Sequence, residues 1–431
     1  MYTPTMSIVI KYGGTALGTV DGFTLVVETV KVLRQTKEKV VIVVSAIGKT
    51  TDSILHASKL ARSQDSHYEQ IIEQLLHTHL DFNQELQESI QSQERGEQFL
   101  QTTFQKLKSI LYGVYLTNEL TNKVLDHLLS FGETLAAHLL FFYLQGNVAQ
   151  ELQLVDSVKL IATDTNYGNA QVDFEKTREN YTLLSAEIVS AKIWVVPGFI
   201  AGDPTGNITT LGRGGSDYTA AILGFILDVD EVIIYTDVDG IMTADPRLIP
   251  QATSIPALSY KDMFQLANYG ANVVYSPTII PLYKKNIPVT IKNMFNPHFI
   301  GTTIRKEKVR HLHPLIAVNS MEICLIKLYG EGLIGRIGIS GKLFSTLSLT
   351  QINVLFISQS SSEHSIHVGI SPDMLEFARP NLLETFQPYL KHGFEIVFQS
   401  RVILVTIEGF FLFCINLIAI KHIHAGNLDL T

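Results

Sequence analysis

The residues of this chain best suited to chemistry lie in one short stretch, residues 210–217, with the sequence TLGRGGSD. Its glycines let the backbone turn sharply and let a ligand come close, and an alanine-rich helical pattern follows at once. The first N–H groups of a helix have no partner within the helix and attract negative charge. The stretch therefore predicts an anion-binding loop, although Ser216 and Asp217 could also cap a helix for purely structural reasons.

A lysine at the end of a short predicted strand, residues 7–11, is the second candidate. The turn YGGT and a helix-like stretch, residues 26–33, come next. This order places Lys11 at the carboxyl edge of a sheet, where α/β folds bind ligands. The turn matches neither a P-loop nor a dinucleotide-binding motif. A lone Lys-x-Gly-Gly is a weak signal, and an ordinary surface turn also explains it.

Three further predicted strands, residues 39–44, 192–196 and 230–235, each end in a polar or glycine-containing turn. Helical patterns separate them, which is typical of a mostly parallel α/β sheet sandwiched by helices. Glu133 precedes the helical stretch 134–143, so we expect it near a helix start, where it could simply complement the helix dipole. The polar residues expected at one edge of the sheet are Lys11, Ser45, Thr51, Glu133, Arg213, Ser216, Asp217, Thr236 and Asp237.

The composition of the 431 residues limits the class of protein. A hydrophobic share of 46% with 17% charged residues predicts two or three well-packed domains. A net charge of −8 without a dense basic run disfavours a nucleic-acid partner. Cys324 and Cys414 are too few for a disulfide scaffold. We expect a cytoplasmic protein without a membrane span, since residues 1–10 lack a signal-peptide pattern and the apolar run 410–420 is shorter than the ~20 residues a span needs.

A second domain is predicted after a solvated connector near residues 304–313. The patterns that follow it read as strand, helix, strand, strand, helix, strand, which is the order of a ferredoxin-like module. Their ranges are 322–329, 333–347, 353–358, 365–370, 374–389 and 401–407. Such a module behind an enzyme is more plausibly regulatory than catalytic. We therefore expect a catalytic domain over residues 1–304 and a regulatory region over residues 314–431.

Cations, carboxylates and hydroxyls at the starts of helices suit a reaction between two polyanions. Transfer of a phosphoryl group from ATP to a carboxylate fits, because the nucleophile is already ionised at neutral pH. Such an enzyme has to suppress repulsion, align the attack and stabilise charge on the transferred group. Nothing in the sequence matches a Ser-His-Asp set or a His/Glu metal motif, and His77 and His79 are spaced too closely to share a helical face.

Six motifs together resemble aspartokinase, and they cover roughly the first 300 residues. They are KYGGT from Lys11, the turn from Ser45 to Thr51, FGE ending at Glu133, GRGGSD from Gly212 to Asp217, TDVDG from Thr236 to Gly240, and Asp245-Pro246-Arg247. The stretches Ile352-Asn353-Val354 and Ser358 to Glu363 resemble the ACT module appended to that family. The resemblance implies an amino-acid kinase (carbamate-kinase-like) fold followed by ACT modules, the first near residues 316–393 and a reduced second near 394–431.

The resemblance also implies the reaction and its residues. The enzyme would use ATP and Mg²⁺ to convert L-aspartate into 4-phospho-L-aspartate, the entry to lysine, diaminopimelate, threonine and methionine synthesis. Lys11 would bridge the transferred phosphate and the attacking carboxylate, and Asp217 would orient Lys11 and the hydrated magnesium without a direct metal bond. The aspartate site would comprise Ser45, Thr51, Glu133, Arg213 and Ser216, with Arg213 on the α-carboxylate and Glu133 on the α-ammonium. The nucleotide site would comprise Lys11, Gly13, Gly14, Thr236, Asp237 and Arg247.

The chain departs from the family pattern at three places. Asn272 stands where the family usually has a lysine that reaches the nucleotide, which would weaken ATP binding. The helix of the second ACT module is missing between residues 402–407 and 415–420. Leu355 stands where lysine-regulated members often have an acidic residue. Lysine, threonine or no effector at all therefore stay open, with Gln359 and Glu331 as candidate contacts, and the ACT module implies a homodimer or a higher homo-oligomer.

Two other functions compete with aspartate kinase. The first is a kinase of the same superfamily that acts on another acid, although Arg213 and Glu133 together demand an α-amino acid. The second is a non-catalytic, effector-binding protein that has kept the fold, which Asn272 and the reduced tail favour. Lys11, Arg213 and Asp217 argue against this second alternative.

Overall fold

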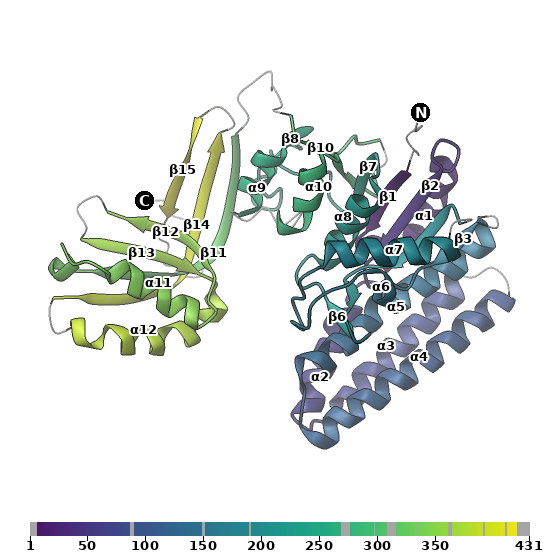
Figure 1. The fold of residues 1–431 in the computed structure, drawn as a ribbon, viewed down its shortest axis with the longest axis horizontal. Coiled ribbons are helices and arrows are strands. Elements are labelled where there is room, and N and C mark those ends of the chain that lie inside the picture. Colours follow the sequence, from purple (N-terminus) through teal and green to yellow (C-terminus); the bar gives the residue numbers. More distant parts are fainter. Residues whose placement is uncertain are drawn as a thin grey trace. The chain divides into compact units, whose positions relative to one another are not determined.

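The computed structural model describes residues 7–86, 90–148, 151–188, 191–268, 276–296, 298–307, 316–333, 335–360, 364–390, 393–409 and 412–419. The chain forms two compact units. The first consists of Met1–Met242, Thr253–Phe264 and Asn272–Arg310, and the second of Thr243–Ala252, Gln265–Ala271 and His311–Thr431. Each unit has its own sheet (Figure 1).

An eight-stranded sheet forms the centre of the first unit, in the order β3-β4-β2-β1-β7-β9-β10-β8. All neighbours are parallel except β9 and β10. The strands are β1 (Ser7–Tyr12), β2 (Lys39–Val44), β3 (Leu152–Leu154), β4 (Ile193–Pro197), β7 (Glu231–Thr236), β8 (Ala257–Ser259), β9 (Val289–Asn293) and β10 (Thr302–Arg305). The central strands are apolar and buried on both faces, as parallel strands under two layers of helices require.

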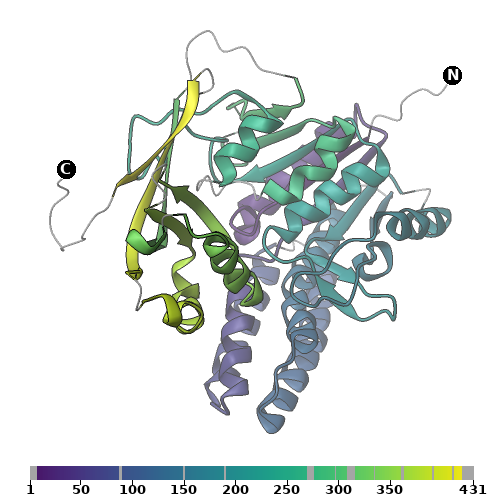
Figure 2. The ribbon, with the colours of Figure 1, turned by 60° about the vertical axis from the view of Figure 1, so that its left-hand side comes forward.

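Helices cover this sheet, as the sequence predicts. The α-helices described up to β9 are α1 (Val20–Leu33), α2 (Thr50–Arg62), α3 (His67–Leu86), α4 (Ile90–Thr117), α5 (Asn122–Asn147), α6 (Ser157–Leu160), α7 (Phe174–Ile188), α8 (Gly215–Leu227), α9 (Tyr260–Asn268), whose last residues belong to the second unit, and α10 (Ile280–Lys285). Helices α3 and α4 pack against each other and extend away from the sheet (Figures 1 and 2). A small hairpin of β5 (Ile200–Gly202) and β6 (Ile208–Thr210) precedes α8.

The two faces of β1 contact different helices. Ile8, Ile10 and Tyr12 belong to the core that includes residues of α1 and α5. Side chains alternate along a strand, so Lys11 points to the opposite face, where α8 packs against β1. Strand β1 also lies between β2 and β7, with Lys11 opposite Val43 and Ile234. The chain thus leaves β1 towards β2 first and returns to its other side with β7, the arrangement that opens a ligand crevice at the carboxyl ends of strands.

Helix α5 corrects one prediction from the sequence. It begins at Asn122, where the side chain of Thr121 accepts a hydrogen bond from the N–H of Val124, and not at residue 134. Glu133 therefore lies in the middle of the helix, and the expectation that it complements a helix start is wrong. Gly132 is accommodated inside the helix and does not break it. By length and composition α5 alone among the described helices could cross a membrane, but 72% of its most apolar window is buried inside the protein, as in a core helix.

The second unit contains a five-stranded antiparallel sheet in the order β12-β13-β11-β14-β15. Its elements are β11 (Ile316–Tyr329), α11 (Ile339–Leu349), β12 (Val354–Gln359), β13 (Ser365–Ile370), α12 (Leu375–Leu390), β14 (Glu395–Gly409) and β15 (Leu412–Ala419). The first six confirm the predicted ferredoxin-like βαββαβ order. The last strand of that module starts earlier than residue 401, and β15 pairs with its outer edge as a hairpin.

Candidate active site

A cavity of about 260 Å³ opens at the carboxyl ends of β1 and β2. It is lined by Lys11, Ser45, Thr51, Glu133, Phe199, Gly212, Gly214, Gly215, Ser216 and Asp217. Six residues predicted from the sequence to act on substrate are therefore gathered in one place, although four separate segments supply them. Two larger pockets of the first unit, of about 460 and 570 Å³, contain neither Lys11 nor Asp217. The chemistry of the lining, and not the volume, identifies the smaller cavity as the candidate active site.

An ion pair joins the two predicted catalytic residues. Nζ of Lys11 lies 2.6 Å from Oδ1 of Asp217, and the two side chains are 13% and 12% exposed. Asp217 lies in the first turn of α8, where the helix dipole favours a carboxylate. Gly214, in the left-handed region at φ 70°, immediately precedes this helix. The pair fixes the ammonium of Lys11 at the cavity wall and still leaves it two N–H donors for an anionic ligand.

Glu133 is a buried carboxyl group without a hydrogen-bond partner for its Oε2 among the described residues. Burial raises its pKa to about 8, against the backbone hydrogen bond from Ala46 and the charge of Lys11, which both lower it. Without a ligand the group is therefore mostly protonated at neutral pH. A ligand cation placed beside it would supply the missing partner and stabilise the ionised form.

Three hydroxyl groups complete the polar lining. Ser45 follows β2 directly and donates its N–H to the carbonyl of Tyr12 at 3.1 Å, while Thr51 and Ser216 lie in the first turns of α2 and α8. Glycines make room for two of them. A Cβ on Gly132 would lie 2.6 Å from Oγ1 of Thr51, and one on Gly198 would lie 2.7 Å from Cβ of Ser216. The cavity therefore combines hydroxyls with the positive ends of two helices, which suits an anion.

The predicted nucleotide residues are only partly accounted for. Gly13 donates its N–H to the carbonyl of Tyr235 at 3.2 Å, and a Cβ on Gly14 would lie 2.5 Å from the carbonyl oxygen of Ala46. Packing of the turn against its neighbours thus explains Gly14 without a phosphate. Thr236 is the last residue of β7, and its hydroxyl donates a hydrogen bond to the carboxylate of Asp237 at 3.1 Å; neither residue lines the cavity. Their contact with nucleotide stays a prediction.

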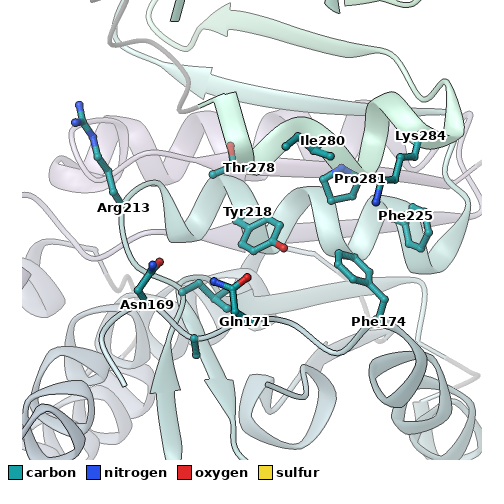
Figure 3. A pocket seen from close by; sticks show the side chains of 12 residues that line it. Asn169, Gln171, Phe174, Arg213, Tyr218, Phe225, Thr278, Ile280, Pro281 and Lys284 are labelled. Atoms are coloured by element: carbon teal, nitrogen blue, oxygen red, sulfur yellow. The ribbon is translucent and has the colours of Figure 1, made fainter. Parts of the chain in front are cut away.

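The two arginines are not among the residues that line this cavity. Arg213 lies between two lining glycines, but its exposed side chain lines the neighbouring pocket of about 460 Å³ (Figure 3). Arg247 belongs to the second unit, where Asp245 holds its guanidinium through two nitrogens, the shorter contact being 2.8 Å. The α-carboxylate role of Arg213 requires its side chain to turn towards the cavity, and both roles stay predictions.

The candidate effector contacts lie in the second unit. Gln359 is the exposed last residue of β12, and Glu331 is the exposed first residue of the short 3₁₀ turn Glu331–Leu333. Both roles stay predictions. Asn272 falls outside the described residues.

Asp126 is a positioning residue that sequence reasoning missed. Its carboxylate, only 1% exposed, accepts the N–H and the hydroxyl of Thr210 at 2.9 and 2.8 Å and the N–H of Gly168 at 2.9 Å. These hydrogen bonds hold Thr210 in place, and Thr210 leads into the loop at Gly212. Asp126 lies seven residues before Glu133, and this spacing places the two residues on the same face of a helix. The spacing could have identified Asp126 only if α5 had been predicted to begin at Asn122.

Phe199 was missed as well. It has a positive φ of 65°, donates its N–H to Oγ1 of Thr219 at 3.0 Å, and lines the cavity. A Cβ on Gly215 would lie 2.5 Å from its ring, so the start of α8 packs directly on Phe199.

This fold and this site define a protein of the amino acid kinase class with an appended domain built on an antiparallel sheet. The model of the amino acid kinase family matches residues 6–293, which is most of the chain, and an ACT domain model matches residues 326–386. The chain therefore belongs to the amino acid kinase family.

Individual relatives confirm the predicted resemblance to aspartokinases. The chain is 31% identical over 393 residues to the bifunctional aspartokinase/homoserine dehydrogenase 2 of Zea mays, covering 89% of this chain and 42% of that protein. It is 31% identical over 418 residues to the bifunctional enzyme of Haemophilus influenzae, covering 93% of this chain and 49% of that protein. The chain thus spans less than half the length of these two relatives.

A solved structure confirms the fold. The structure of E. coli aspartokinase III in complex with aspartate and ADP (R-state) has a TM-score of 0.79 and 24% sequence identity, covering 93% of this chain and 87% of that one.

Proposed function

We propose that this chain is an ATP-dependent aspartate kinase that phosphorylates the β-carboxylate of L-aspartate. One observation carries the proposal: the Lys11–Asp217 ion pair lines one cavity together with the buried carboxyl of Glu133, whose Oε2 has no hydrogen-bond partner among the described residues. The first suits a phosphoryl group and the second suits an ammonium group, so the site fits a substrate that is an amino acid and a phosphoryl acceptor. The aspartate and ADP bound by E. coli aspartokinase III, and the names of the relatives, support aspartate as that amino acid.

In the proposed reaction a β-carboxylate oxygen attacks the γ-phosphorus of ATP. The new O–P bond forms as the bond to the β,γ-bridging oxygen breaks, and ADP leaves with that electron pair. The attacking carboxylate is ionised at neutral pH, so the protein does not need to remove a proton. Lys11 stabilises charge on the transferred group, and Asp217 fixes the direction of the ammonium group of Lys11.

The remaining lining residues would orient the amino acid. Glu133 takes the α-ammonium, and Ser45, Thr51 and Ser216 donate hydrogen bonds beside the two helix N-termini. Arg213 reaches the α-carboxylate after its side chain turns. An acylated acid lacks the ammonium, so it would leave the carboxyl of Glu133 buried and unpaired, which disfavours an acetylglutamate-type substrate.

Mg²⁺ fits this site as an ion carried by the nucleotide. Within the described ranges no group of three His, Cys, Asp or Glu side chains could hold a metal by itself. Mg²⁺ commonly binds substrate phosphates and water with only one or two carboxylates, and Asp217 would be the carboxylate of the cavity that orients the hydrated ion. When bound, the ion neutralises charge on the phosphates.

The test is formation of aspartyl hydroxamate from aspartate, ATP, Mg²⁺ and hydroxylamine. Lys11→Ala should lower turnover by at least ~100-fold, because it removes charge stabilisation of the transition state. The control is Lys159→Ala, since this lysine is 73% exposed and distant in sequence from the lining residues. Full activity of Lys11→Ala, or preferential turnover of glutamate or acetylglutamate, would contradict the proposal.

We also infer that the ACT domain makes the enzyme responsive to an amino acid and lets it form a homo-oligomer. The E. coli aspartokinase III structure in complex with lysine and aspartate (T-state) supports an amino-acid effector. The same assay with lysine, threonine and methionine would identify it, and inhibition by none of them would refute this inference. A single monomeric species in sedimentation would refute the oligomer.

A further inference from the structure

The pocket of about 460 Å³ is separate from the cavity of Lys11 and Asp217, and of its lining residues only Arg213 has a role in the proposed reaction (Figure 3). It is lined by Asn169, Ala170, Gln171, Phe174, Leu211, Arg213, Tyr218, Phe225, Thr278, Ile280, Pro281 and Lys284. In Figure 3 Tyr218 of α8 lies between Gln171 and Phe174 on one side and Pro281 and Lys284 on the other. Arg213 lies at one end of the pocket and extends away from the rest.

The lining of this pocket suits an organic anion. Its charged members are both cations, Arg213 and Lys284, and all twelve lining residues are described. Burial raises the pKa of Tyr218, so its hydroxyl stays protonated and can donate a hydrogen bond. Asn169 and Gln171 add amide donors. A ligand carboxylate would find several donors here and no lining carboxylate to repel it.

The same pocket has an apolar side. Phe174 and Phe225 pack edge to face with ring centroids 5.2 Å apart, and Ile280 and Pro281 add further apolar surface to the lining (Figure 3). Nζ of Lys285 lies 4.9 Å from the ring centroid of Phe225 and forms an ion pair with Asp228 at 2.8 Å, so it compensates that carboxylate beside the aromatic pair. An apolar wall with a few convergent polar groups is the usual composition of a small-molecule site. The ligand class that fits is a small organic anion with an aromatic or aliphatic body.

One stretch of chain forms a wall of both this pocket and the candidate active site. Leu211, Arg213 and Tyr218 line the pocket, whereas Gly212 and residues 214–217 line the cavity of Lys11 and Asp217. Gly212 and Gly214, on either side of Arg213, have φ values of 71° and 70°, and Arg213 lines a different pocket from these two glycines. A ligand that packs on Tyr218 therefore touches the residue next to Asp217, and one that pairs with Arg213 holds back the predicted α-carboxylate ligand.

We propose that this pocket is a second binding site, for a small organic anion with an apolar body, and that its occupancy lowers the affinity of the neighbouring cavity for its amino-acid substrate. The coupling, but not the binding, rests on the proposed function. Because coupling between two sites is reciprocal, aspartate must weaken the binding of the anion by the same factor.

Binding is tested on the full chain by calorimetric titration with 3-phenylpropionate, and with neutral 3-phenylpropanamide as the ligand control. We expect saturable binding of the acid and at least ~10-fold weaker binding of the amide. Lys284→Gln should weaken the binding of 3-phenylpropionate by about 10-fold, since a charge-assisted hydrogen bond is lost. The matched control, Lys176→Gln, removes a cation that follows Phe174 by two residues and pairs with Glu179 outside the pocket, so the Kd should not change. No saturable binding, or equal effects of the two lysine variants, would overturn the site.

Coupling is tested by repeating the titration in saturating aspartate. We expect the Kd of 3-phenylpropionate to rise several-fold, and we expect Lys284→Gln to leave the Kd of aspartate unchanged. An unchanged Kd of 3-phenylpropionate would refute the coupling between the two sites, but it would not refute binding of the anion in the pocket. A loss of aspartate affinity in Lys284→Gln would mean that aspartate itself occupies the pocket, which also overturns the coupling. Absence of hydroxamate formation would refute the proposed function. The titration with 3-phenylpropionate would still decide whether the pocket binds an anion.

Discussion

Asp126 accepts two hydrogen bonds from Thr210, one from its N–H at 2.9 Å and one from its hydroxyl at 2.8 Å. Glu133 lies seven residues later on the same face of α5. One rigid helix thus holds the chain that leads into the loop at Gly212 and also presents the carboxyl expected to bind the substrate ammonium.

Asp126→Ala should disturb both stability and substrate binding. It leaves the N–H groups of Thr210 and Gly168 without their acceptor in a buried place, which should cost about 2–4 kcal/mol of unfolding free energy. It should also raise the KM for aspartate more than it lowers kcat, because the loop is released while Lys11 and Asp217 remain. Denaturant unfolding and steady-state kinetics measure the two effects. Asp126→Asn keeps one acceptor oxygen and should fall between wild type and Asp126→Ala; unchanged values for both variants would show that the loop does not depend on this carboxylate.

Gly132→Ala should damage the site by crowding. The added Cβ would lie 2.6 Å from Oγ1 of Thr51 and 2.8 Å from Cβ of Ala46, so the start of α2 or the turn before it must shift. We expect a loss of about 1–3 kcal/mol and a raised KM for aspartate. Gly146→Ala is the matched control on the same helix, since nothing lies within 4 Å of its added Cβ, and alanine there should be neutral or stabilising by up to ~1 kcal/mol. Similar losses in both variants would point to a general effect on α5.

The binding of aspartate should depend on pH through Glu133. Its pKa of about 8 in the free protein means that the ionised form, which pairs with an ammonium, becomes more populated as pH rises towards 8. The facing charged group is Lys11, which lowers this pKa and itself pairs with Asp217. The KM for aspartate should therefore fall by up to ~10-fold per unit between pH 6 and 8 and then level off. Glu133→Gln should raise KM and remove this dependence; a parallel pH profile would contradict the assignment.

The same pKa shift predicts that folding stability decreases as pH rises, whereas the binding of aspartate strengthens. In the unfolded chain Glu133 releases its proton near 4.5, whereas the folded protein keeps it up to about 8. Between these values the unfolded state gains charge first, so the contribution of Glu133 to stability decreases as pH rises, at about 1.4 kcal/mol per unit. The melting temperature of Glu133→Gln relative to wild type should therefore increase from pH 5 to pH 9. A constant difference would show that the carboxyl is already ionised at low pH.

The strands and the polar turns that end them could be predicted because parallel strands are continuous apolar runs, and Lys11 and Ser45 follow from the ends of two such strands. Asp217 follows from the glycine-rich stretch and the helical pattern after it. The start of α5 could not be predicted, because Gly132 resembles a helix break. Only the packing of α5 against Thr51 shows why a glycine stands at this position. The direction of the Arg213 side chain could not be predicted from the sequence either. It depends on the left-handed backbone at Gly212 and Gly214, and glycine permits that conformation without requiring it.

The position of β1 has a consequence for synthesis. The first strand of the chain is completed only by β7, which lies more than 200 residues later, and Lys11 meets Asp217 only when α8 packs on that sheet. Contacts between residues so distant in sequence form slowly, and in a nascent chain the backbone N–H and C=O groups on this edge of β1 stay unpaired until β7 has left the ribosome. While the segment between β2 and β7 is translated, this edge of β1 therefore has no β7 to pair with.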